Sequence, residues 1–256
     1  MILEKTAFTE DSVENMISGE STFKVNIQND IYNTLDLYPS ALLNGIKTTL
    51  IYPATEKHIA KYTAQDMHLI TETAQDYESI TLPYLNREQF NIQWVFNILE
   101  KKTESERIVF EDSNPETGFI LLPDMKWNTK QMEDLYLIAI IHKHGIKSLR
   151  DLTPEHLPLL RNILNKGLSA ILDKYHVPAS KLRVYLHYQP SYYHLHVHFT
   201  HLRFNAPGSG VDRAHLLSDV IDNIELMPDY YQRKTLSFSS KENEKLSVAF
   251  SEAGRI

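Results

Sequence analysis

Short apolar stretches separated by polar residues fill the first 53 residues of the chain. FKVNI at 23–27 alternates apolar and polar residues, and KTTLIY at 47–52 is rich in β-branched residues. Alternation with a period of two is typical of strands that bury one face. The pattern therefore predicts a small β-rich N-terminal domain over residues 1–64.

A polar stretch with a thin apolar face follows Pro53. Thr55 is a residue type that caps helices, and apolar residues recur behind it at spacings that suit a helix: Ile59, Met67, Ile70 and Ala74. We interpret residues 65–80 as a hinge helix that leads into a C-terminal domain over residues 81–256.

The C-terminal domain combines strand-like and helix-like patterns. Alternation at Ile92, Trp94, Phe96 and Ile98, together with the runs at 107–110 and 118–122, predicts three strands of one antiparallel sheet. Apolar residues at helical spacing predict helices over 128–144 and 154–175, and the second of these has Thr153 as its cap and Pro154 in its first turn.

A hairpin follows these helices. A strand over 182–188 reaches the turn Gln189-Pro-Ser-Tyr and returns as HLHVHFT at 194–200; a turn over 206–210 then precedes a predicted helix from Asp212. The expected class is α+β, a mostly antiparallel sheet covered by helices.

The returning strand carries the most informative chemistry. Alternate side chains share a face of a strand, so His194, His196 and His198 are expected about 6 to 7 Å apart on one side. Three neutral imidazoles suit a metal with an open position, or one imidazole can attack phosphorus while its neighbours stabilise charge. The alternative without a functional site is a strand whose histidines face only solvent. The clustering of five of the twelve histidines within 187–201 argues against it.

Composition narrows the possible partners. The net charge of −7 argues against bulk binding to a phosphate backbone, so any nucleic-acid ligand should be short. With 0 cysteines the chain has no thiolate nucleophile and no cysteine-ligated zinc. We expect no membrane span, because no apolar run approaches the roughly 18 residues that one requires.

The histidine strand resembles the signature of the histidine-triad superfamily of nucleotide hydrolases and transferases. Longer stretches resemble the scavenger mRNA decapping enzyme family within it: ILLPDMKWN at 120–128, SLRDLTPEHLPLLRNIL at 148–164 and RVYLHYQPSYYHLHVHFTHLRFNAPGSGVDRAHLL at 183–217. The likeness begins at ILEK (residues 2–5), before which the family carries further residues. We therefore expect a truncated N-terminal domain.

This resemblance implies hydrolysis of the 7-methylguanosine cap on dinucleotides or short capped oligonucleotides left by 3′-to-5′ mRNA decay. The products would be 7-methyl-GMP and a 5′-diphosphate-ended remainder, formed through a nucleotidyl-histidine intermediate without metal or other cofactor. By position in the motif His196 is the nucleophile, and His194 and His198 assist it. His187, Lys126 and Arg213 are implied to contact the phosphates; from spacing alone, Arg213 could equally be an exposed residue of a helix N-terminus.

Cap recognition is also implied residue by residue. The resemblance points to Trp94 for stacking on the methylated base, Glu104 for the guanine edge and Asp124 for the ribose or base. Met125 stands opposite the tryptophan where the family tends to carry leucine. Ser191 and Tyr192, in the hairpin turn, join the substrate-binding set. From spacing alone, Trp94 would be a core residue and Glu104 a solvated one.

Asn29 and Tyr32 match lid residues that close over the cap; without the resemblance they would be an ordinary strand-end turn. Because that lid belongs to a domain exchanged between protomers, a homodimer is implied. Capped dinucleotide or short capped RNA is the expected partner, rather than long nucleic acid or membrane, and the expected location is cytoplasmic and nuclear. Two rivals stay open: a histidine-ligated metallohydrolase and a non-catalytic cap sensor.

Overall fold

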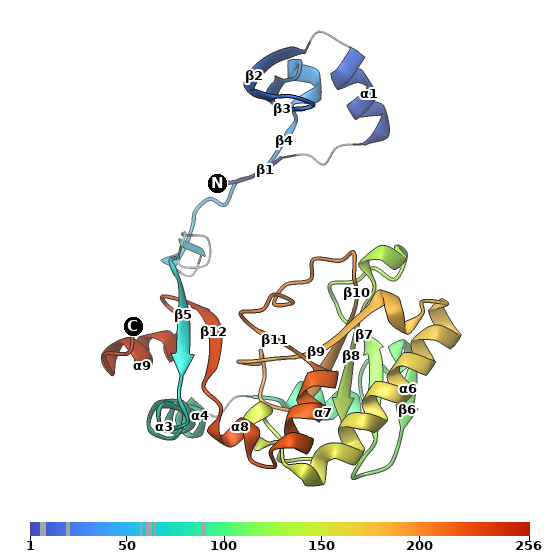
Figure 1. Ribbon diagram of the computed structural model, residues 1–256, viewed down its shortest axis with the longest axis vertical. Coiled ribbons are helices and arrows are strands. Elements are labelled where there is room, and N and C mark those ends of the chain that lie inside the picture. Colours follow the sequence, from blue (N-terminus) through green and yellow to red (C-terminus); the bar gives the residue numbers. More distant parts are fainter. Residues whose placement is uncertain (6–8, 19–20, 57, 60–62, 64, 89–90) are drawn as a thin grey trace. The chain divides into compact units, whose positions relative to one another are not determined.

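The computed structural model describes residues 1–5, 9–18, 21–56, 58–59, 63, 65–88 and 91–256. They form two compact units (Figure 1), unit 1 over Met1–Ala64 and unit 2 over Gln65–Ile256.

Unit 1 contains two pairs of strands. β1 (Ile2–Lys5) pairs with β4 (Ile46–Thr49), and β2 (Thr22–Asn29) forms a hairpin with β3 (Tyr32–Tyr38). Helix α1 (Glu10–Ser18) and the 3-10 turn η1 (Ala41–Leu43) also belong to this unit. The strand predicted at 23–27 is confirmed in β2, and the one predicted at 47–52 is confirmed only over 47–49, because β4 ends at Thr49.

A six-stranded antiparallel sheet is the centre of unit 2. Its order is β11-β9-β10-β8-β7-β6, and every neighbouring pair is antiparallel. The strands are β6 (Phe110–Asp112), β7 (Phe119–Pro123), β8 (Tyr136–Ile141), β9 (Leu182–His187), β10 (His196–His201) and β11 (Ala214–Leu216). With its helices this sheet confirms the predicted α+β class.

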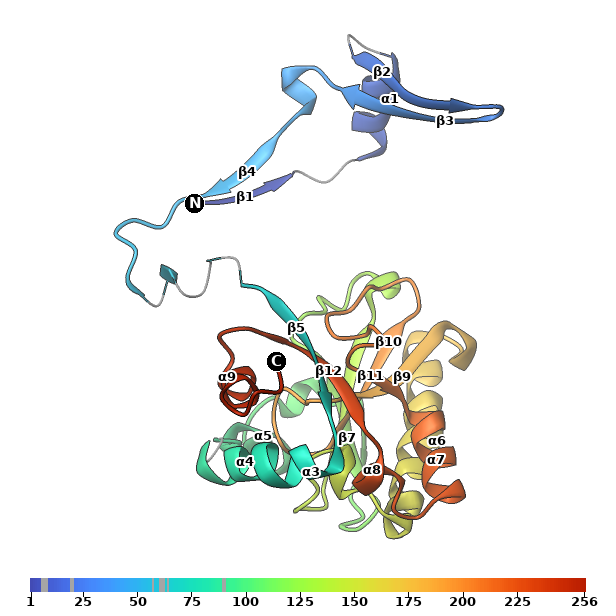
Figure 2. The ribbon, with the colours of Figure 1, turned by 60° about the vertical axis from the view of Figure 1, so that its left-hand side comes forward.

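Helices α6 (Leu157–Tyr175) and α7 (Leu217–Leu226) lie along this sheet (Figures 1 and 2). Gly167 permits a close approach of α6, because a Cβ there would lie 2.5 Å from the Phe199 ring of β10. Thr153 heads the 3-10 turn η6 (Pro154–His156) before α6, and its N–H donates to His156 Nδ1 at 3.0 Å. The helix predicted over 154–175 is confirmed.

The predicted hinge helix over 65–80 is wrong in its first half. Strand β5 (Met67–Glu72) occupies it and pairs with β12 (Leu236–Lys241), with alternate residues Ile70 and Glu72 buried. The burial of alternate residues shows that this segment is a strand, so the helical spacing of Met67, Ile70 and Ala74 was coincidental. Short helical segments follow: α3 (Ala74–Asp76), the π-helical η2 (Tyr77–Thr81) and α4 (Leu82–Glu88).

Thr55 heads a helical turn, since the Ile59 N–H donates to its carbonyl at 3.0 Å. Residues 57, 60–62 and 64 of the predicted helical stretch lie outside the described residues.

The strand predicted at 92–98 is instead helix α5 (Gln93–Leu99). Val95 and Ile98 are the buried residues, with Ile92 and Leu99 packed against the same core. Spacings of three and four therefore override the apparent alternation. The Asn91 side chain accepts from the Gln93 N–H at 2.9 Å, which favours a helix start there.

The helix predicted over 128–144 is the central strand β8, preceded by the 3-10 turn η4 (Met132–Asp134). All six residues of β8 are buried because the strand pairs with β7 and β10 and is covered on both faces. Such a strand is a continuous apolar run, which periodicity cannot distinguish from a buried helix.

The helix predicted from Asp212 begins only at Leu217, because residues 214–216 form the edge strand β11, which pairs with β9. Likewise the strand predicted at 107–110 begins at Phe110, after the 3-10 turn η3 (Ser105–Arg107). The remaining described elements are the 3-10 turns η5 (Leu149–Asp151) and η7 (Ala179–Lys181) and helices α8 (Tyr230–Arg233) and α9 (Lys245–Glu252).

Candidate active site

The β9–β10 hairpin brings three imidazoles together. The ring centroids of His187 and His198 are 4.1 Å apart, and those of His196 and His198 are 4.9 Å apart. Val197 and Phe199 of β10 are buried, as the strand alternation predicts, and Leu195 just before the strand is buried too. The hairpin thus places His187 beside the histidine strand, in agreement with the sequence prediction.

His194 does not join this cluster, which corrects the expected face of His194, His196 and His198. β10 begins at His196, so the alternation of the strand does not extend back to residue 194. The His194 ring instead packs edge-on against Phe96, and its Nε2 lies 2.8 Å from the Ile141 carbonyl. The three described histidines whose nitrogens lie within 4.8 Å of one another are His187, His196 and His198.

His194 contributes through its backbone. Its carbonyl accepts from His196 Nδ1 at 2.8 Å, so Nδ1 carries the proton and Nε2 keeps its lone pair. His196 Nε2 is buried and has no hydrogen-bond partner among the described residues. Burial lowers the pKa of His196 to about 4, so the ring is neutral at pH 7. A buried, neutral and oriented nitrogen is suited to nucleophilic attack.

His198 and His187 flank this nitrogen. His198 Nδ1 lies 3.0 Å from the Tyr136 hydroxyl, and burial lowers its pKa well below the usual value. Burial, and then the positive charge of Arg213, lower the pKa of His187 to about 3. Gly208 lies against the His187 ring with φ +78°, and a Cβ there would be 2.6 Å from Nε2.

Arg213 and Lys126 place positive charge beside the cluster, since both lower the pKa of His187 and His198. Arg213 Nη2 donates to the Gln189 carbonyl at 2.7 Å. The Lys126 backbone N–H donates to Asp124 Oδ1 at 2.9 Å, and its ammonium lies 5.4 Å from the centre of the Tyr136 ring. Fixed cations beside a nucleophile can bind and stabilise phosphate.

An aromatic series connects Trp94 to His196. The Tyr192 ring stacks on His196 at 3.9 Å with an interplanar angle of 11°, and Trp94 meets Tyr192 edge-on at 4.8 Å. Trp94 is 42% exposed, so the core position suggested by spacing alone is wrong. An exposed indole in this place is available to stack on a ligand.

Arg107 links Glu104 to the end of β7, next to Asp124. Glu104 forms an ion pair with Arg107, and Arg107 Nη2 donates to the carbonyl of Pro123 at 2.8 Å, one residue before Asp124. Met125, in the turn after Asp124, is 85% exposed. Glu104 is thus attached through Arg107 to the last residue of β7, and Asp124 is the residue that follows this strand.

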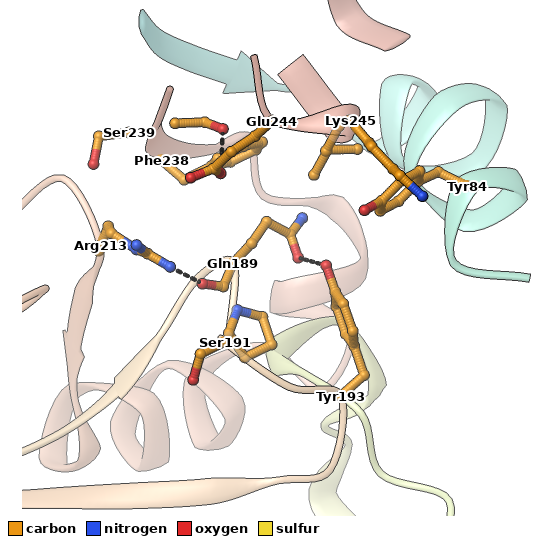
Figure 3. A pocket seen from close by; sticks show the side chains of 12 residues that line it. Tyr84, Gln189, Ser191, Tyr193, Arg213, Phe238, Ser239, Glu244 and Lys245 are labelled. Carbon is orange, nitrogen blue, oxygen red and sulfur yellow. Dashed lines mark hydrogen bonds between the residues drawn. The ribbon is translucent and has the colours of Figure 1, made fainter. Parts of the chain in front are cut away.

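Ser191 and Arg213 line a cavity of about 360 Å³ beside the hairpin turn (Figure 3). Tyr84 and Lys245 line its other side. Asn29 and Tyr32 pair across the end of the β2–β3 hairpin, on either side of Asp30 with φ 50°. Both residues belong to unit 1.

Comparison with known protein families identifies the family of this chain. The family model described as "Scavenger mRNA decapping enzyme C-term binding" matches residues 93–214, and the one for the N-terminal part of the scavenger mRNA decapping enzyme matches residues 1–65. The chain belongs to the scavenger mRNA decapping enzyme family. This membership confirms the resemblance and the enzyme class predicted from the sequence.

Individual decapping relatives cover almost the whole chain. An m7GpppX diphosphatase of Sus scrofa is 58% identical over 255 residues, which are 100% of this chain and 76% of that protein. The m7GpppX diphosphatase of Homo sapiens is 56% identical over 253 residues, 99% of this chain and 75% of that protein. That of Schizosaccharomyces pombe is 40% identical over 255 residues, 96% of this chain and 83% of that protein.

The sequence prediction missed tyrosines that contact the histidine cluster, Tyr136 among them. Tyr136, which contacts His198, lay in the stretch expected to be helical. A signal was present, because Tyr136 is the one polar-tipped side chain in the run YLIAII at 136–141. The described part of the chain contains no helix long and apolar enough to cross a membrane.

Proposed function

We propose that this chain hydrolyses the triphosphate bridge of 7-methylguanosine-capped dinucleotides and short capped oligonucleotides, with a histidine-triad type of site. The observation that carries the proposal is His196: its Nδ1 is bound to the His194 carbonyl, its Nε2 is buried and neutral, and the positive charge of Lys126 acts on the ring. Relatives that are 56% and 58% identical to the chain over the aligned residues are named m7GpppX diphosphatase, which supports this substrate.

The reaction proceeds in two displacements. His196 Nε2 attacks the phosphorus next to 7-methylguanosine; the N–P bond forms, the P–O bond to the next phosphate breaks, and the diphosphate leaves with the electron pair. Water then attacks the same phosphorus and the P–N bond breaks. This releases 7-methyl-GMP and restores the imidazole. Arg213, Lys126 and His187 stabilise the negative charge on the phosphates.

Cap recognition uses the exposed aromatic and acidic side chains near the hairpin. Trp94 stacks on the positively charged methylated base, an arrangement that favours a cation over the neutral guanine. Glu104 accepts from the guanine edge, Asp124 from the ribose or base, and Met125 packs on the face of the base opposite the tryptophan. The Tyr192 ring keeps His196 shielded from water beside this site.

A homodimer with exchanged unit 1 domains completes the proposal. Cross-strand pairs Phe23–Leu37 and Val25–Leu35 share a face of the β2–β3 hairpin, and all four side chains are exposed. Apolar pairs of this kind need a covering partner, and we assign that role to a second copy. Asn29 and Tyr32, at the tip of the same hairpin, act as the lid. Light scattering of the purified protein tests this: a monomer at micromolar concentration contradicts it.

The deciding experiment incubates the protein with a capped dinucleotide in excess chelator and identifies the products. We expect 7-methyl-GMP and a nucleoside diphosphate. His196→Asn keeps a donor for the His194 carbonyl and should release neither product while still binding 7-methyl-GMP. The matched control His176→Asn changes an exposed histidine with φ 57°, which Asn tolerates, and should be fully active.

A metallohydrolase is the second candidate, because nitrogens of His187, His196 and His198 lie within 4.8 Å of one another. Zinc would bind three such imidazoles and lower the pKa of a bound water. Loss of activity in chelator, with recovery on adding zinc, would establish this candidate. Tight cap binding without turnover by the wild type would instead indicate a sensor.

A further inference from the structure

A buried ion pair lies outside the histidine cluster. Glu72 on β5 and Arg150 in the turn η5 meet at 2.7 Å, with side chains 0% and 1% exposed. Arg150 also donates to the carbonyls of Tyr231 at 2.8 Å and Lys234 at 2.7 Å. A fully buried pair adds little net stability compared with apolar residues, so its value lies more in holding the groups that it contacts in one arrangement.

The Glu72 carboxylate gathers three further donors. It accepts from Thr81 Oγ1 at 2.5 Å, from Gln189 Nε2 at 3.2 Å and from the hydroxyl of Tyr188. Tyr188 and Gln189 form the turn that directly follows β9, and the preceding residue is His187. The buried pair is therefore tied to the end of the strand that carries one of the clustered imidazoles.

Arg213 is held by the same two turn residues. The Tyr188 backbone N–H donates to the Arg213 carbonyl at 2.8 Å, and the Gln189 carbonyl accepts from Arg213 Nη2 at 2.7 Å. In Figure 3 the guanidinium points at the Gln189 carbonyl, while the Gln189 side chain accepts from the Tyr193 hydroxyl at 3.2 Å. Both ends of Arg213 thus depend on where residues 188 and 189 lie.

We propose that Tyr188 and Glu72 are positioning residues: the Tyr188 hydroxyl, bound to the buried Glu72 carboxylate, fixes the turn that aims Arg213 at the transferred phosphate. The inference rests on the proposed function, in which Arg213 stabilises phosphate charge. It assigns a part in the reaction to groups that do not touch the substrate, and it connects β5, which follows unit 1 along the chain, to the catalytic hairpin.

A double-mutant cycle tests the proposal. Tyr188→Phe removes one hydroxyl, and we expect kcat to fall about tenfold, the scale of effect seen when groups that orient a site are removed, with KM for the capped dinucleotide almost unchanged. In an Arg213→Lys background, which keeps the charge but not the geometry, Tyr188→Phe should have little further effect, because coupled residues are not additive. Glu72→Gln repeats the cycle from the other end of the same hydrogen bond, and if only one variant folds, that one decides.

Tyr231→Phe is the matched control. It removes a hydroxyl that accepts from Asn223 at 3.1 Å in the same core and leaves the carbonyl contact to Arg150 in place. It should lower the melting temperature without changing kcat. Additive losses in the cycle, or an equal loss of kcat in Tyr231→Phe, would overturn the inference and leave a structural ion pair. A wild type that releases no 7-methyl-GMP would defeat the proposed function instead, so the two failures are distinguishable.

Discussion

Burial of His196 should make the wild-type protein sensitive to acid, and His196→Asn should remove part of that sensitivity. The pKa of this residue is lowered from 6.5 to about 4 by burial. Between these values the unfolded chain holds a proton on residue 196 that the folded protein does not. The stabilisation is therefore fully present above pH 6.5 and is lost as the pH falls toward 4.

The size of the effect follows from the two pKa values. Linkage gives a loss of about 2 kcal/mol in the free energy of unfolding between pH 8 and pH 5 from this one histidine. Asparagine does not titrate, so His196→Asn should lose about 2 kcal/mol less than the wild type over the same interval. His187 and His198 remain in the variant, so it keeps the rest of the acid sensitivity.

Urea unfolding at pH 8 and pH 5, followed by tryptophan fluorescence, measures this difference. Both tryptophans, Trp94 and Trp127, lie in unit 2, so the signal reports the unit that contains His196. His176→Asn is the control and should lose as much stability as the wild type. If the free energy of unfolding falls equally in the wild type and in His196→Asn, His196 is not a buried neutral imidazole and the reasoning fails.

Three further predictions follow from the site. Because His196 has a pKa of about 4, kcat/KM should stay level as the pH falls from 7 to about 5.5, and a decline centred on 6.5 would contradict a buried nucleophile. Trp94→Ala should weaken 7-methyl-GMP binding by roughly tenfold while GMP binding changes less, because the lost stacking favours the cationic base; calorimetry that finds wild-type affinity equal for the two ligands counts against stacking. Gly208→Ala places a Cβ 2.6 Å from His187 Nε2 at φ +78°, so kcat should fall and stability should decrease by about 1–2 kcal/mol; an unchanged melting temperature and kcat would refute the close packing.

The hairpin that carries the chemistry could be predicted from the sequence because its pattern is local. Alternation over 194–200 and the turn at 189–192 together place His187 beside His198. The same alternation misplaced His194, since no local signal shows that β10 begins two residues later. A period of two predicts which residues share a face only where the strand exists.

The errors in secondary structure have a common physical cause. The continuous apolar run of β8 and the mixed spacing of α5 are decided by packing against distant strands, which a single window of sequence does not contain. The Glu72–Arg150–Tyr188 contacts could not be predicted for the same reason: they join residues 78 and 116 positions apart. Arg213, by contrast, was assigned to the phosphates through family resemblance rather than through spacing.

The central claim is that His196 forms a transient bond to phosphorus. Wild-type protein turning over a capped dinucleotide in excess chelator can be quenched in alkaline denaturant, digested and analysed by mass spectrometry. The account predicts a peptide carrying a 7-methyl-GMP adduct on His196, absent from His196→Asn. Steady product formation with no adduct on that peptide at any quench time would contradict it.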